Sequence, residues 1–134
     1  MKASLKPGIA TSKTVTVDEP RCIGFMGKDA AVYATPRMVS DVEYTCRDFL
    51  LEHLDPGEDS VGAHVSIDHL APTPMGLSVT IEVRVAEVDR RKVAFEFSVK
   101  DPIEEVGRGR HVRFVVDTAK TRERLAAKRA SAGL

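Results

Sequence analysis

The sequence predicts an α+β fold, in which one long helix lies across one face of an antiparallel β-sheet. Two patterns indicate this fold. From residue 61 onward, apolar and polar residues alternate in successive runs, which is typical of strands with one buried face. Before these runs, residues 35–54 repeat their apolar positions with the period of a helix, and this helix is the element available to cover the apolar face of the sheet.

The chain has 134 residues, which is the size of one domain. We expect a domain over residues 1–118 and a basic tail or short helix over residues 119–134. Twenty basic side chains balance twenty acidic ones, which argues against a general nucleic-acid binder. The N-terminal residues lack the apolar core of a signal peptide, and no apolar run approaches the roughly 20 residues that cross a bilayer. We therefore expect a cytoplasmic protein that binds neither nucleic acid nor membrane.

The first predicted elements are a strand and the long helix. Residues 13–17 alternate as Lys-Thr-Val-Thr-Val and predict a strand, whereas residues 18–34 are irregular. Thr35 and Pro36 form a favourable helix start, with a hydroxyl at the N-cap and a proline at the first helical position. Asp55-Pro56-Gly57 ends the helix. Its apolar face is predicted to contain Val39, Val42, Cys46, Phe49 and Leu50. We interpret Cys46 as a small buried residue rather than a nucleophile.

Four further strands are predicted, separated by breaks at residues 71–76 and 89–91. The last of them spans about residues 105–117. In each strand the apolar residues share one parity, which we expect to face the helix. These positions are Val61, Ala63, Val65 and Ile67, then Leu77, Val79, Ile81, Val83 and Val85, then Val93, Phe95, Phe97 and Val99, and finally Val106, Val112, Phe114 and Val116.

Three polar residues break these patterns and are candidates for a site. Glu43 lies within the apolar stripe of the helix, although its carboxylate could swing out to water. His69 has the parity of the buried positions in its strand, although a lone histidine there is often a core residue. Thr35, as N-cap, has a structural role of its own, yet it lies eight residues before Glu43, about two turns and 80° around the helix. Together these residues would form a compact polar cluster, typical of a reactive site.

Other polar residues give weaker signals. His111 and Arg113 have the polar parity of the last strand, so position alone predicts that they are solvated. His64 is predicted to face away from the helix. Gly107-Arg108-Gly109 indicates a bulge or a close approach of another group to the backbone. The spacing of histidine, cysteine and acidic residues gives no metal-ligand pattern, so we predict neither a metal nor a cofactor.

Several motifs, in matching order from about Thr14 to Asp117, resemble the fluoroacetyl-CoA thioesterase-like family of hot-dog proteins. They are Tyr33-Ala34-Thr35, Glu43, Leu54-Asp55-Pro56-Gly57-Glu58, His69, Ala71-Pro72-Thr73-Pro74-Met75-Gly76 and Gly107-Arg108-Gly109-Arg110-His111-Val112-Arg113. The resemblance implies a hot-dog fold, in which an antiparallel sheet wraps around a central helix. It also implies a homodimer or higher homo-oligomer with sites near the interface. It further implies a catalytic set of Thr35, Glu43 and His69, with substrate contacts from Gly62 and Arg113.

The implied function is hydrolysis of a short, medium or aromatic acyl-CoA, with Glu43 as base or as nucleophile. The alternative is a non-catalytic hot-dog module that binds an acyl thioester or another apolar ligand. A hot-dog hydratase is a third hypothesis, but its usual Asp/His arrangement is not found. The sequence departs from the family before Thr35: residues 22–32 form a shorter segment with Phe25 as the one aromatic residue, and Pro36 and Arg37 replace less bulky or apolar residues. We therefore expect no specificity for a fluoroacetyl group.

Overall fold

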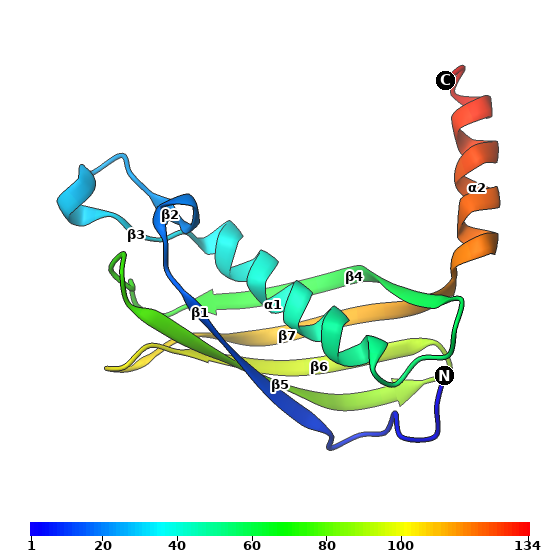
Figure 1. The fold of residues 1–134 in the computed structure, drawn as a ribbon, viewed down its shortest axis with the longest axis horizontal. Coiled ribbons are helices and arrows are strands. Elements are labelled where there is room, and N and C mark those ends of the chain that lie inside the picture. The colour runs from blue at the N-terminus through cyan, green and yellow to red at the C-terminus, as the bar shows by residue number, and fades with distance from the viewer.

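The computed structural model describes every residue from Met1 to Leu134 and contains a five-stranded antiparallel sheet with strand order β1-β5-β6-β7-β4. The prediction of an α+β fold is confirmed, and the sheet curves around α1, as Figure 1 shows. The elements are β1 (Ala10–Thr16), β2 (Cys22–Ile23), β3 (Val32–Tyr33), α1 (Thr35–Leu51), β4 (Glu58–His69), β5 (Ser78–Asp89), β6 (Lys92–Lys100), β7 (Glu105–Asp117) and α2 (Thr118–Ser131).

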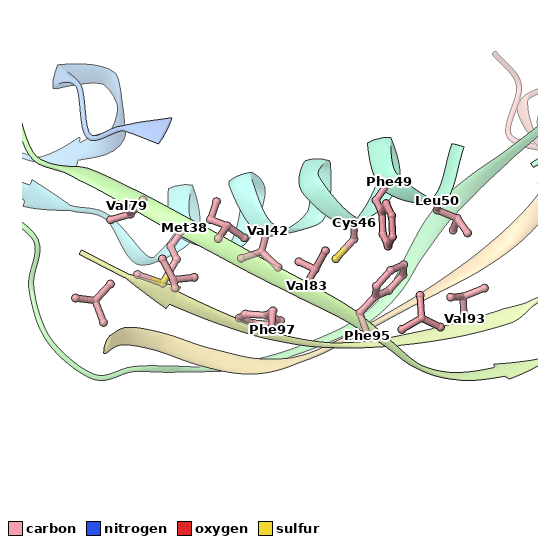
Figure 2. Close-up of a cluster of buried hydrophobic side chains, with 14 of the residues drawn as sticks. Met38, Val42, Cys46, Phe49, Leu50, Val79, Val83, Val93, Phe95 and Phe97 are labelled. Atoms are coloured by element: carbon pink, nitrogen blue, oxygen red, sulfur yellow. The ribbon is translucent and has the colours of Figure 1, made fainter. Parts of the chain in front are cut away.

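The core lies between α1 and the concave face of the sheet (Figure 2). Met38, Val42 and Cys46 project from successive turns of α1 and are fully buried. Each fully buried aliphatic side chain of this size contributes about 1.5–3 kcal/mol relative to exposure. The sheet supplies mostly β-branched and aromatic partners: Val79, Ile81, Val83, Val85, Val93, Phe95, Phe97 and Val99. In β5 and β6, the residues predicted to face the helix therefore do so.

Strand β4 departs from the predicted alternation because it contains a β-bulge. Gly62 pairs with Arg113 and His64 pairs with Val112, so Ala63 has no partner of its own. The extra residue reverses the parity of the strand, since side chains on either side of a bulge no longer alternate in one register. Val61 was expected to face the helix, but it lies on the outer face and is 47% exposed.

Strand β7 shows the opposite parity from the one predicted. Val115 belongs to the core, whereas Phe114 lies on the outer face and is 42% exposed. The prediction for Val106, Val112, Phe114 and Val116 as one inward-facing set is therefore wrong, although Val106 itself is buried in the core. The glycines explain the choice of face. A Cβ at Gly107 would lie 2.5 Å from Met38 Sδ, and one at Gly109 would lie 1.9 Å from the Ser66 carbonyl oxygen. The residues of β7 that alternate in step with Gly107 and Gly109 thus face α1, and a side chain at either glycine would meet these neighbours.

The segment between β1 and α1 is fixed to the helix by one acidic residue. Asp41 on α1 accepts hydrogen bonds from Arg21 Nε at 2.9 Å and Nη2 at 3.2 Å, and from the hydroxyl of Tyr33. Burial is the main cause of a raised pKa for Tyr33, so its hydroxyl stays protonated and donates to Asp41. The short pair β2–β3 is thereby held against the N-terminal half of α1.

Two features of the outer boundary matter for assembly. Strand β4 is hydrogen-bonded to β7 on one side and forms the edge of the sheet on the other, and its central residues 61–66 are exposed. Helix α2 occupies most of the segment predicted as a tail or short helix and projects away from the sheet beside the start of β4 (Figure 1). No residue of α2 is buried. Neither helix is long and apolar enough to span a membrane.

Candidate active site

Thr35 and His69 form a direct pair at the N-terminal end of α1. Thr35 Oγ1 lies 2.6 Å from His69 Nδ1. The sequence predicted Thr35 as the N-cap, but α1 begins at Thr35 itself, Ala34 occupies the N-cap position, and no side-chain cap is formed. The hydroxyl therefore serves the histidine rather than the helix end.

His69 presents its second ring nitrogen to the interior without a partner. The Nε2 atom is buried and has no hydrogen bond within the chain. Burial lowers the pKa of His69 below its ordinary value of 6.5, so the imidazole is neutral at pH 7. The pair borders a hollow of about 520 Å³ with mostly apolar walls: Ile23, Phe25, Val32, Tyr33, Thr35, Pro36, His69, Leu70, Ala71 and Pro72. An unsatisfied nitrogen beside an apolar hollow suits a polar atom brought by a ligand.

Glu43 lies in a second hollow of about 460 Å³, between the middle of α1 and the start of β4. Its side chain is 38% exposed, with Oε1 3.9 Å from His111 Nε2. A Cβ at position 62 would lie 2.7 Å from Glu43 Oε1 and 3.5 Å from Arg113 Nη1. Gly62 therefore leaves open a space that both the carboxylate and the guanidinium border. The structure thus places Glu43, Gly62 and Arg113 in one hollow.

His111 and Arg113, predicted to be solvated, are buried on the helix side of β7, with exposed fractions of 0% and 6%. The parity of β7 decides this, because the odd-numbered residues of that strand face α1. Arg113 donates from Nε to Ser60 Oγ at 2.7 Å and from Nη2 to the Ser60 carbonyl at 2.9 Å. His64, in contrast, is exposed on the outer face, as predicted. Sequence reasoning missed Ser60 and His111, and the glycines of β7 were the signal that could have placed His111 inside.

The structure does not assemble the predicted cluster within one chain. Thr35 and Glu43 are separated by about 12 Å along the helix axis, from eight residues of helical rise. Gly62, which lies beside Glu43, pairs with Arg113 on β7. His69, which lies beside Thr35, pairs with Gly107 on the same strand. Arg113 and Gly107 are six residues apart, so the two positions are separated by roughly 20 Å along the sheet. A single bridging water spans about 6 Å. Glu43 and His69 of the same chain therefore cannot exchange a proton directly.

Cys46 is not part of this chemistry. It is fully buried, and burial raises the pKa of its thiol to about 12. A thiol with such a pKa is protonated at pH 7 and is a poor nucleophile. Its interpretation as a small buried residue agrees with this position.

Comparison with known proteins identifies the family. Residues 17–119 match the family described as fluoroacetyl-CoA-specific thioesterase. The chain belongs to this family. Among curated proteins, the fluoroacetyl-CoA thioesterase of Streptantibioticus cattleyicolor is 36% identical over 89 residues, which cover 66% of this chain. The match spans 64% of the length of that relative.

Solved structures confirm the hot-dog fold for this member of the fluoroacetyl-CoA-specific thioesterase family. A structure of the fluoroacetyl-CoA thioesterase FlK superposes with a TM-score of 0.84 at 26% identity, and covers 93% of this chain and 98% of the other. A hot-dog-like protein from Thermanaerovibrio acidaminovorans superposes with a TM-score of 0.85 at 22% identity, over 91% of each chain. A thioesterase superfamily member from Thermus thermophilus gives a TM-score of 0.85 at 24% identity, over 97% of this chain and 98% of the other.

Proposed function

We propose that the protein is an acyl-CoA thioesterase that hydrolyses a short, medium or aromatic acyl thioester to the free acid and CoA. The observation that supports this most strongly is the Thr35–His69 pair, which presents a buried, unpartnered imidazole nitrogen beside an apolar hollow. Thioester hydrolysis needs a proton relay next to a site for the acyl group, and the pair and the hollow supply both. The 36% identical fluoroacetyl-CoA thioesterase supports the same class of reaction.

In the proposed reaction, Glu43 acts on the thioester in one of two ways. As a base it removes a proton from the water that attacks the carbonyl carbon, and as a nucleophile it attacks that carbon itself and forms an anhydride, which water then hydrolyses. The carbon–sulfur bond breaks in both routes. The proton lost by the water ends on the leaving thiolate, and His69 Nε2 relays it. The Gly62 N–H and the Arg113 guanidinium stabilise the negative charge on the carbonyl oxygen.

This mechanism requires a second copy of the chain, because Glu43 and His69 of one chain are too far apart. Strand β4 is the free edge of the sheet, and its central residues are exposed. We propose that β4 pairs antiparallel with β4 of a second copy, so that the His69 end of each strand lies beside the Gly62 end of the other. His69 then lies near Gly62 of the partner subunit, since the bulge places both residues on the helix side of the sheet. Glu43 of the partner subunit completes the site.

Mixing two inactive variants tests the shared site. Glu43→Gln and His69→Ala each remove one partner from every site of their own homodimer. After subunit exchange, a heterodimer contains one site with both native residues, so a 1:1 mixture should recover about a quarter of wild-type activity. Thioester hydrolysis before and after exchange is the measurement, and sedimentation confirms the dimer. No recovery after verified exchange, or a stable monomer at micromolar concentration, would contradict the shared site.

The acyl group is expected to be larger than fluoroacetyl. Phe25, the one aromatic residue of the segment before β3, borders the hollow but is 81% exposed, so it does not close over it. Even in a closed apolar pocket one small-group difference is worth only about 1–3 kcal/mol. We expect fluoroacetyl-CoA to show no large advantage over acetyl-CoA, and butyryl-, hexanoyl- or benzoyl-CoA to be hydrolysed faster than either. Steady-state kinetics with a thiol-reactive dye would measure this. A fluoroacetyl preference of more than about a hundredfold over acetyl would contradict it, and binding without hydrolysis of any thioester would favour the non-catalytic alternative.

A further inference from the structure

His111 is a buried histidine that the proposed reaction does not use directly. Its side chain is fully buried, and Nδ1 lies 2.7 Å from the carbonyl oxygen of His64. On its other side, Nε2 lies 3.2 Å from Arg113 Nη1. The imidazole therefore connects β4, through a main-chain carbonyl, to the guanidinium at the Glu43 site.

These two contacts fix the protonation of His111. A carbonyl oxygen only accepts hydrogen bonds, so Nδ1 carries the proton. An arginine side chain only donates, so Nε2 must offer its lone pair to Arg113. Both requirements are met by the neutral ring with its proton on Nδ1 and by no other form. Burial agrees with this, since it lowers the pKa of His111 and keeps the ring neutral at pH 7.

His111 controls the one end of the guanidinium that faces the reaction. Ser60 holds Nε and Nη2 of Arg113, so the planar guanidinium can still tilt only about the line through these two nitrogens, which moves Nη1. Nη1 is the atom that lies 3.5 Å from a Cβ built on Gly62, in the space shared with the Glu43 carboxylate. The contact to His111 Nε2 fixes that tilt, and without it Nη1 would lose its acceptor and the plane would tilt toward the Glu43 carboxylate, away from the position that a carbonyl oxygen occupies.

We infer that His111 is a positioning residue, which in its neutral Nδ1–H form holds Arg113 Nη1 in place to serve a ligand oxygen beside Gly62. This role rests on the proposed thioesterase function, because Arg113 is given its task by that reaction. The charged or titratable groups around the ring are Arg113 on β7, Glu43 on α1 and His64 on β4. Protonation of Nε2 would remove the acceptor and place a cation against Arg113, while the Glu43 carboxylate is 3.9 Å away.

Two amide variants separate positioning from simple space filling. The amide oxygen of His111→Gln reaches the place of Nε2 and accepts from Arg113, whereas the amide nitrogen of His111→Asn reaches only the place of Nδ1 and donates to the His64 carbonyl. We expect His111→Gln to keep kcat within the same order of magnitude as wild type. We expect His111→Asn to lower kcat by about 10–100-fold, the effect of losing a hydrogen bond to a charged group, with little change in KM. His53→Gln and His53→Asn, at the C-terminal end of α1 and outside both hollows, are the matched controls and should both retain activity.

A measurement on the wild-type protein tests the same inference without activity. Nitrogen-15 NMR of the imidazole rings should show His111 as the neutral Nδ1–H tautomer at pH 7, assigned by the loss of its signals in His111→Gln. An Nε2–H tautomer or a charged ring would overturn the inference, and so would equal losses in the two folded amide variants. If the wild type hydrolyses no thioester, the proposed function fails, while the NMR result still decides the protonation and hence the contact to Arg113.

Discussion

Glu43→Gln is expected to lower kcat for thioester hydrolysis by about 10²–10⁴, the range for losing a general base. The amide has nearly the shape of the carboxylate, but it neither removes a proton from water nor attacks a carbonyl. The helix that holds Glu43 does not depend on its charge, because the buried face of α1 is made by Met38, Val42 and Cys46. We therefore expect the variant to fold and to bind substrate. Steady-state kinetics and thermal unfolding of the same preparation would measure both effects.

A matched control for this variant is Glu52→Gln, at an exposed position that caps the C-terminal end of α1. It removes the same charge from the same helix but lies outside both hollows, so its activity should equal that of the wild type. If Glu43→Gln hydrolysed thioesters within a few-fold of the wild type, Glu43 would have no part in the mechanism.

His69→Ala should produce a second loss of comparable size, at least about 100-fold, because the proton relay to the leaving group disappears. The pH profile distinguishes this loss from a packing defect. The folded-state pKa of His69 lies below 6.5 and the neutral ring is the active form, so wild-type activity should fall as the pH drops below about 6.5. The residual activity of His69→Ala should lack that dependence. Rates measured between pH 5 and 8 would test it.

His53→Ala is the control for His69→Ala, since it removes an imidazole at the C-terminal end of α1, outside both hollows. It should leave both the rate and the pH profile unchanged. If His69→Ala kept the wild-type profile, His69 would be only a buried residue beside Thr35.

Much of the fold follows from local sequence patterns. The helical stripe of α1 and the alternation in β5 and β6 show which side chains avoid water. In the structure, these side chains are buried in the strands whose apolar face was predicted correctly. Thr35 and His69 were also predicted as neighbours, and the hydrogen bond between them agrees with that prediction. The helical stripe and the alternation depend on spacing along a single element, which a sequence displays directly, whereas the Thr35–His69 contact joins α1 to β4.

The remaining features depend on contacts between elements. The parity of β7 is decided by Met38 and Ser66, which leave room only for glycine at 107 and 109, so alternation within β7 gave the wrong face. The same alternation assigned His111 and Arg113 to solvent. Both can be buried because the Arg113 guanidinium donates to Ser60 and to Nε2 of His111. The distance between Glu43 and His69 likewise follows from the register of β4 with β7.

The bulge at Ala63 also limits how this protein can change in length during evolution. Gly62 and His69 share a face only because one unpaired residue lies between them. Deleting Ala63 would turn His69 to the opposite side of the sheet from Gly62, and inserting one further residue would do the same. A pair of residues could be gained or lost without changing faces, but it would shift the histidine by about 7 Å along the strand. Under the proposed mechanism, the spacing between Gly62 and His69 therefore tolerates no change in length, whereas a turn such as residues 101–104 can change in length without moving either residue.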